Sequence, residues 1–271
     1  METGALLSLT FSVDILAKGI ELITTSIGNR TLAESNIDKI NEFLEDNVSE
    51  QGITKDINGE EIIINVQNLY FSYNDKVIFK NVNFCILPGE HVLITGNNGE
   101  GKSTLLNLLC GLYRPNHGKI YYGSTDTSSI CIHSLSQKYA YISQENNIAY
   151  GNIFENVALD NVYDKNKILN ILKKFNMLNT ISTPPINLSQ GEKQRINIAR
   201  ALYRSQEVSI LFADEAFANI DDENTARILN TLKEEYKNKT MVFVAHTDLH
   251  IKFDKILTVT NGTVHVSESR N

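Results

Sequence analysis

The stretch Gly96-Asn97-Asn98-Gly99-Glu100-Gly101-Lys102-Ser103 decides the fold, because it matches the pattern G-x-x-x-x-G-K-[ST] between an apolar strand and a leucine-rich helix. The strand is predicted at His91–Thr95, and the helix is predicted to begin near Lys102. Glycines let the backbone turn so that several N–H groups converge on one anion, and the helix adds the positive end of its dipole. The stretch therefore predicts a phosphate-binding loop in a nucleotide-binding protein.

Two side chains complete the predicted loop. Lys102 is expected to reach the β- and γ-phosphates as a point charge, and the Ser103 hydroxyl is expected to bind the Mg²⁺ that bridges them. The alternative is a glycine-rich turn that arose by chance, and the strand–loop–helix context argues against it.

The composition excludes several function classes. A chain of 271 residues can form one large core or one core with an appendage, and its formal charge of −7, without a Lys/Arg cluster, argues against a nucleic-acid-binding surface. Cys85, Cys110 and Cys131 are odd in number and lack C-x-x-C spacing. A disulfide framework or a zinc site is therefore not expected. The cysteine usage instead predicts that the protein works in a reducing cytosol.

The first fifty residues differ from the rest of the chain. Residues 5–27 are apolar but contain Asp14, Lys18 and Glu21, which are costly in lipid unless they face a bundle interior or water. The segment is a poor solitary membrane span, and it lacks the positive start and the cleavage site of a signal peptide.

A helical arm is predicted to continue through residues 31–46. Leu32, Ile37, Ile40 and Leu44 lie along one side at helical spacing, and charged residues occupy the other positions. The polar residues 47–58 resemble a linker. We therefore divide the chain into an arm, residues 1–50, and a domain, residues 51–271.

Beyond residue 60, strands alternate with helices. The first two strands, within residues 62–79, are expected to pair antiparallel around a turn at Asn74-Asp75, and Asn261-Gly262 predicts a type I′ hairpin. The other predicted strands are 139–143, 208–213, 241–245, 256–259 and 263–266, and the predicted helices are 165–177, 192–203 and 223–236. This alternation predicts an α/β domain with a largely parallel sheet wrapped by helices and with ligands at the carboxyl ends of strands.

Polar residues follow three of the predicted strands. Asp214-Glu215 could place one carboxylate near Mg²⁺ and the next near an attacking water, although an acidic pair is also a common helix N-terminal feature. His246 and Gln144 follow two other strands, and taken alone each is a weaker signal, because a lone histidine is usually structural or merely exposed.

The stretch Leu188-Ser189-Gln190-Gly191-Glu192-Lys193-Gln194-Arg195 begins a helix with a serine and a glycine that offer a hydroxyl and free N–H groups to an anion. Together with the preceding motifs, in this order, it resembles the signature of ATP-binding cassette (ABC) proteins. The resemblance covers residues 60–266. It implies the P-loop NTPase cassette fold, with a mixed sheet core, an antiparallel β subdomain and a helical subdomain.

The resemblance implies a role for each motif. Residues from Gly96 to Thr104 match Walker A, and Tyr73 matches the aromatic residue that stacks on adenine, with a tyrosine packed on a strand pair as the alternative. The other matches are Gln144 with the Q-loop glutamine at Mg²⁺, Ser189 and Gly191 with the signature pair, Asp214 with the Walker B aspartate at Mg²⁺, Glu215 with the catalytic glutamate, Asp221 with the D-loop aspartate, and His246 with the switch histidine.

The resemblance also implies partners. ATP is expected to be sandwiched between Walker A of one cassette and the signature of a second, identical or different cassette. The arm resembles the last transmembrane helix and the connecting helix of ABC exporters, and the stretch Gly151-Asn152-Ile153-Phe154-Glu155-Asn156 also resembles exporters. In these proteins, transmembrane helices hold the cassette at the cytoplasmic face of the membrane. An amphipathic helix that docks on a partner is the alternative for the arm. If the exporter interpretation holds, the chain is a piece of a longer protein or a subunit whose membrane partner is separate.

Some positions depart from the usual pattern. Gln190 and Glu192 replace the common glycine and glutamine of the signature, and Ala218-Asn219-Ile220 replaces Ser-Ala-Leu before Asp221. The segment between Gln144 and the signature is short and lacks the acidic-glycine stretch of exporters, which leaves coupling to a membrane domain open. An importer ATPase subunit remains the main alternative function. A ribosome-acting ABC ATPase would carry two cassettes, and a DNA-repair head would carry a long insertion.

Overall fold

The computed structural model describes residues 62–74, 76–149, 151–245 and 251–268. The predicted arm, residues 1–50, and the linker that follows it lie outside the described residues, as does His246. The elements below therefore all belong to the predicted ATP-binding domain.

A six-stranded sheet forms the middle of this domain, in the order β10-β9-β3-β8-β7-β6. Five of its strands run parallel, as the alternation of strands and helices predicts, and β10 pairs antiparallel with β9. The bounds are β3 His91–Thr95, β6 Tyr139–Ile142, β7 Ile210–Asp214, β8 Thr240–Val244, β9 Lys255–Thr260 and β10 Thr263–Glu268.

The turn between β9 and β10 has the geometry that its sequence predicts. Asn261 and Gly262 have φ values of 49° and 77°, and a type I′ turn requires positive φ at both central residues. The Lys80 N–H donates to the Gly262 carbonyl at 2.8 Å. Lys80 belongs to a second, four-stranded sheet, so the turn also contacts that sheet.

A second, four-stranded antiparallel sheet has the order β2-β1-β4-β5. Its bounds are β1 Ile64–Tyr73, β2 Lys76–Ile86, β4 His117–Tyr122 and β5 Thr125–Asp126. The antiparallel pairing of β1 with β2 is as predicted, and Asn74 adopts a left-handed φ of 48° at the turn. The sequence did not predict β4, which begins with exposed polar residues and buries only Ile120 and Tyr122.

Helices cover the strands and connect them. The bounds are α2 Lys102–Leu109, α3 Ile132–Ser136, α4 Ile153–Ala158, α5 Lys165–Lys174, α6 Gln190–Tyr203 and α7 Asp222–Glu235, with short 3₁₀ turns at Thr127–Ser129, Leu178–Thr180 and Pro185–Asn187. The predicted helix at 165–177 ends early because Asn176 adopts a left-handed φ of 54°. The Met177 N–H then donates to the Leu172 carbonyl at 2.8 Å, which closes a Schellman turn.

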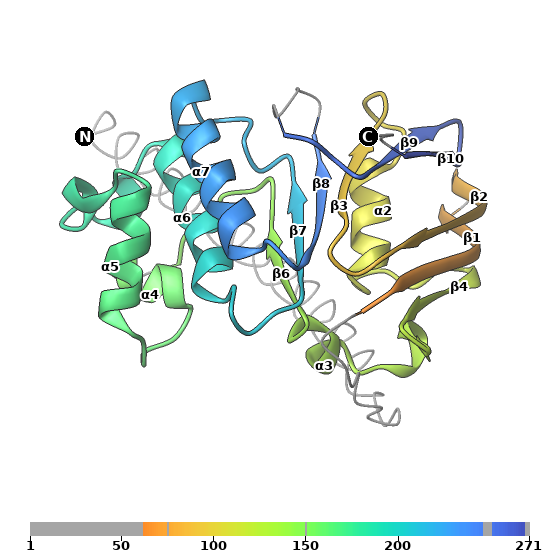
Figure 1. Ribbon diagram of the computed structural model, residues 1–271, viewed down its shortest axis with the longest axis horizontal. Helices are drawn as coiled ribbons and strands as arrows, with labels where there is room; N and C mark the ends of the chain where they lie inside the picture. Colours follow the sequence, from red (N-terminus) through yellow and green to blue (C-terminus); the bar gives the residue numbers. More distant parts are fainter. Residues whose placement is uncertain (1–61, 75, 150, 246–250, 269–271) are drawn as a thin grey trace, which may run out of the picture. The chain divides into compact units, whose positions relative to one another are not determined.

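The middle sheet separates two hydrophobic cores, and β7 shows how. Leu211 and Ala213 belong to one core, with helices α4, α5, α6 and α7, whereas Ile210 and Phe212 belong to the other, with α2 and the antiparallel sheet. Alternate residues of a strand point to opposite faces, so a fully buried apolar strand contributes to both layers. Figure 1 shows α6 and α7 beside β7 on one side and α2 beside β3 on the other.

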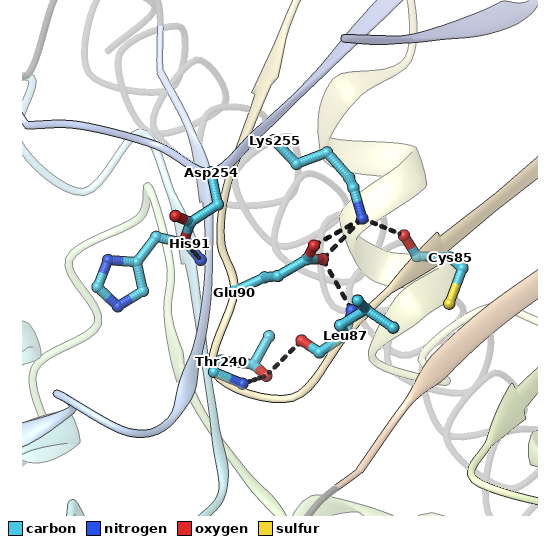
Figure 2. A network of polar contacts seen from close by, with 8 residues as sticks. Cys85, Leu87, Glu90, His91, Thr240, Asp254 and Lys255 are labelled. Atoms are coloured by element: carbon cyan, nitrogen blue, oxygen red, sulfur yellow. Dashed lines mark hydrogen bonds and ion pairs between the residues drawn. The ribbon is translucent and has the colours of Figure 1, made fainter. Parts of the chain in front are cut away.

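A polar network joins the amino ends of β3, β8 and β9 (Figure 2). The Lys255 ammonium donates to both Glu90 carboxylate oxygens, at 2.9 and 2.7 Å, and to the Cys85 carbonyl at 2.7 Å. Glu90 also accepts from the Leu87 N–H at 2.7 Å. Because the Lys255 side chain is 7% exposed, this ion pair is nearly withdrawn from water. It lies at the end of the sheet opposite to the phosphate-binding loop.

Candidate nucleotide-binding and hydrolysis site

The predicted phosphate loop connects β3 to α2, as the sequence indicates. Gly96, Gly99 and Gly101 have positive φ values of 144°, 81° and 99°. A Cβ atom at Gly96 would lie 2.4 Å from the Val259 carbonyl oxygen, and one at Gly101 would lie 2.6 Å from Ile78 Cγ2. Glycine is therefore required at both positions, by backbone conformation and by space.

Lys102 is the first residue of α2 and is 5% exposed. Its ammonium donates to the Asn97 carbonyl at 3.0 Å, so it lies over the loop rather than in solvent. A buried cation beside a helix N-terminus and glycine N–H groups fits a phosphate group.

Glu100 holds the loop against the β9–β10 turn. Its carboxylate accepts from the Asn261 N–H at 2.8 Å. The negative charge of Glu100 is therefore directed at the hairpin. We propose that the backbone of this residue, and not its side chain, contributes to phosphate binding.

Ser103 meets the end of β7 at the base of the loop. Its hydroxyl donates to the Asp214 Oδ1 atom at 3.0 Å. Burial raises the pKa of the Asp214 carboxyl, and the Ser103 hydrogen bond opposes this shift. A hydroxyl and a carboxylate side by side are oxygen ligands of the type that Mg²⁺ prefers, so this pair fits the predicted cation.

Glu215 follows Asp214 in a strained backbone conformation, with a φ of 45°. Its N–H donates to the Val244 carbonyl at 3.0 Å, which fixes it to the neighbouring strand end. Its carboxylate accepts from the Gln144 side-chain amide at 2.8 Å. The structure therefore brings together four predicted site residues from three segments: Ser103, Gln144, Asp214 and Glu215.

Tyr73 ends β1 and is 41% exposed. Its hydroxyl lies 3.3 Å from the Thr104 hydroxyl at the start of α2, so the predicted adenine-stacking residue does lie beside the phosphate loop. The rings of Phe71 and Tyr113 meet it edge-on, at 5.0 and 5.6 Å between centroids. No role was predicted for Tyr113 from the sequence. Its position shortly after α2 could have indicated that it lies near the phosphate loop.

Ser189 is the N-cap of α6, as predicted. Its hydroxyl and its N–H both contact the Glu192 Oε2 atom at 2.8 Å, and the Glu192 N–H faces the Ser189 hydroxyl at 3.3 Å. This capping box places the helix start at Gln190, two residues before the predicted start. The two bonds from Ser189 lower the pKa of Glu192.

Gly191 packs against the loop that precedes α7. A Cβ atom there would lie 2.8 Å from the Asn219 carbonyl oxygen, so close approach of two backbones requires the glycine. Asp221, the predicted D-loop residue, caps α7 by accepting from the Asn224 N–H at 3.0 Å. The signature residues thus contact the α7 loop and their own helix.

Cys110 is buried, and Cys85 and Cys131 are partly buried, with no disulfide among the three in the described residues. Within the described residues, no helix combines the length and apolar character that crossing a membrane requires.

Known proteins resemble this chain in sequence and in structure. The family model of the ABC transporter matches residues 79–218. The mitochondrial iron–sulfur clusters transporter of Danio rerio is 31% identical over 76% of this chain, and a phosphonates import ATP-binding protein of Fusobacterium nucleatum is 35% identical over 75% of it. A solved bacterial Atm1-family ABC exporter with ATP bound has a TM-score of 0.72 and 25% identity over 80% of this chain.

The lengths of these proteins differ. The chain spans 29% of the iron–sulfur clusters transporter and 40% of the solved exporter, but 91% of the phosphonates import protein. The segment that the family model matches carries the phosphate loop, Gln144, the signature and Asp214-Glu215. The chain belongs to the ABC transporter family.

Proposed function

We propose that the chain binds Mg-ATP and hydrolyses it to power transport across a membrane, as the ATP-binding part of an exporter. The observation that carries this proposal is the set of contacts at the end of β7. Ser103 donates to Asp214, and Gln144 donates to the adjacent Glu215. Cation ligands and a candidate general base thus lie beside a phosphate loop.

Binding is assigned to residues that surround this set. Lys102 and the N–H groups of residues 96–104 hold the phosphates, and the exposed ring of Tyr73 stacks on the base. Ser103, Asp214 and Gln144 are the residues that would hold Mg²⁺. When bound, Mg²⁺ neutralises charge on the β- and γ-phosphates.

Hydrolysis is assigned to Glu215. A carboxylate there can accept the proton of an attacking water, and a positioned general base typically contributes about 10²–10⁴-fold to the rate. The hydrogen bond from Gln144 orients this carboxylate at 2.8 Å. His246, which follows β8, is assigned the switch role by resemblance alone.

The complete site requires a second cassette. Ser189 and Gly191 are proposed to contact the γ-phosphate held by the phosphate loop of the partner, with Asp221 at the same interface. The resemblance to ABC proteins supports this arrangement. So does the position of Ser189 and Gly191 at the N-terminus of α6, where helix N–H groups and the helix dipole favour an anion.

The exporter role is supported by the Atm1-family exporter structure and by the exporter-like arm, residues 1–50. Transmembrane helices would then be the second partner and would hold the cassette at the cytoplasmic face of the membrane. An importer ATPase subunit is the second candidate, because the chain covers 91% of a phosphonates import ATP-binding protein. An upstream reading frame that encodes about five membrane helices would favour the exporter.

Light scattering with and without Mg-ATP tests the proposal. Glu215→Gln keeps the size of the side chain and removes its charge, so this variant is expected to bind ATP, to stop hydrolysis and to accumulate as an ATP-dependent dimer. Lys102→Ala is the control that cannot hold the nucleotide. Adding Ser189→Arg to Glu215→Gln is expected to abolish the dimer. Wild-type hydrolysis by Glu215→Gln would overturn the assignment.

A further inference from the structure

The signature helix α6 contacts the segment around Gln144 through a buried amide. The Asn197 side chain is 4% exposed, and its Nδ2 atom donates to the Ser143 carbonyl at 3.0 Å and to the Ser143 hydroxyl at 3.2 Å. The Ser143 hydroxyl in turn donates to the Glu145 carbonyl at 2.6 Å. Asn197 therefore fixes the backbone on both sides of Gln144.

Other contacts between the two segments are weaker. The Gln194 amide reaches the Ser143 carbonyl only at 3.5 Å, and the Asn146 amide reaches the Gln190 carbonyl at the same distance. An N–H···O hydrogen bond is normally 2.7–3.2 Å long, so both contacts lie at the edge of bonding distance. The bonds from Asn197 dominate the attachment.

Burial makes this attachment specific. A buried amide that loses its hydrogen bonds is left without contact to water, and the free energy of the protein rises by the desolvation cost of that amide. The bonds to Ser143 are therefore strongly favoured over any arrangement in which Asn197 is unpaired. Ser143 directly precedes Gln144, whose amide donates to Glu215. A small displacement of Ser143 would therefore move the Gln144 amide away from the carboxylate.

We propose that Asn197 is a positioning residue for ATP hydrolysis, which holds the Q-loop on the signature helix so that Gln144 stays hydrogen-bonded to Glu215. The proposal rests on the hydrolytic role of Glu215 proposed above. The side-chain bonds of Asn197 are to Ser143 and Glu145, so in this proposal it acts through the Ser143–Gln144 backbone. The helix that presents Ser189 to a partner thereby also sets the geometry of this cassette's own hydrolysis site.

Steady-state ATP hydrolysis by the full chain tests the proposal. Asn197→Leu has nearly the same shape and removes the amide donor, so kcat is expected to fall on the order of tenfold, because small misplacements of catalytic groups are costly. The KM for ATP is expected to stay within about twofold, because Lys102 and the phosphate loop are unchanged. Asn197→Ser, whose hydroxyl can still donate, is expected to recover part of the loss.

Thr180→Val is the matched control. Its hydroxyl is buried and donates to the Met177 carbonyl at 2.8 Å, away from the site. This variant loses a buried hydrogen bond too, but kcat should not change. Asn197→Ala is measured beside Asn197→Leu to exclude an effect of overpacking, at a temperature at which circular dichroism shows every variant folded.

A double-mutant cycle decides whether Asn197 acts through Gln144. Gln144→Ala combined with Asn197→Leu is expected to have the kcat of Gln144→Ala alone. A wild-type kcat in Asn197→Leu and Asn197→Ala, or losses that multiply in the double variant, would overturn the inference. If Gln144→Ala and Glu215→Gln both hydrolyse ATP at the wild-type rate, the proposed function itself fails.

Discussion

The side-chain amide of Gln144 donates a hydrogen bond to the Glu215 carboxylate at 2.8 Å, although the two residues are 71 positions apart. β6 and β7 are parallel neighbours, so their carboxyl ends meet at one edge of the sheet. An amide donor does not compete with Glu215 for a proton, whereas a second carboxylate in that place would.

We therefore expect Gln144→Glu to change the pH dependence of hydrolysis. Two carboxylates that share a site repel each other, which raises the pKa of one of them. The acid limb of the pH profile of kcat should move to higher pH, and kcat at pH 7 should fall. Gln144→Leu, the control, should lower kcat without moving the profile. An unshifted limb in Gln144→Glu would mean that the hydrogen bond is not kept during turnover.

Asp214 is predicted to destabilise the nucleotide-free protein at neutral pH. Burial raises the pKa of its carboxyl above the unfolded value, so the folded protein disfavours the charged form. The free energy of unfolding then decreases as pH rises through the unfolded pKa, and the full cost is present above the folded pKa.

Asp214→Asn should remove this cost, because the amide is neutral and its oxygen can still accept from Ser103. At pH 7 the Tm without nucleotide should rise, and each ~1 kcal/mol of relieved cost corresponds to about 2–4 °C in a domain of this size. The gain should shrink as pH falls toward the unfolded pKa. The stabilisation that Mg-ATP gives the wild type should be reduced in the variant. An unchanged Tm at pH 7 would contradict the assigned cost of burial.

The sequence predicted where the site lies better than what holds it together. Strand ends could be located because β7 and β8 are continuous apolar runs, and Asp214-Glu215 follows one of them directly. The hairpin at Asn261-Gly262 could be predicted because type I′ turns select those residues. Each of these patterns lies within a short stretch of the chain, so it can be recognised without knowledge of the fold.

Contacts between distant segments could not be predicted in this way. The neighbours of Asn197 in the sequence do not explain why an amide side chain stands in the middle of a helix. The explanation is its hydrogen bond to Ser143, which belongs to another segment. Gly191 has no unusual φ, and its requirement comes from the Asn219 carbonyl. The signature resemblance identified Ser189 and Gly191. The capping box between Ser189 and Glu192 could also have been predicted, because their spacing is that of the pattern S-x-x-E.

The ion pair between Lys255 and Glu90 provides a test of stability that is independent of the site (Figure 2). Glu90→Gln keeps the shape of the side chain but leaves the Lys255 charge buried without its counter-ion. Removing one partner of a buried pair typically costs about 3–5 kcal/mol, so urea denaturation should show a loss of this size. ATP affinity of the folded fraction should be unchanged, because the pair lies at the other end of β3. A loss below about 1 kcal/mol would mean that water reaches the pair.

The last prediction concerns the boundary between the arm and the domain. The two described cores are built from residues 62–259, around β7 and its neighbours, and each combines strands with helices. A domain with its own core can fold alone, so deletion of residues 1–50 should leave a folded protein that binds ATP as the full chain does.

The apolar stripe predicted for the arm, at Leu32, Ile37, Ile40 and Leu44, has no obvious place on a free cassette, so we propose that it packs against a membrane helix or a partner. Residues 51–271 should therefore remain monomeric to higher concentration than the full chain without nucleotide. Calorimetric titration with ATP and light scattering of both proteins make the comparison. Weaker ATP binding or lower solubility of the shortened chain would show that the arm belongs to the core of the domain, and the boundary near residue 50 would then be wrong.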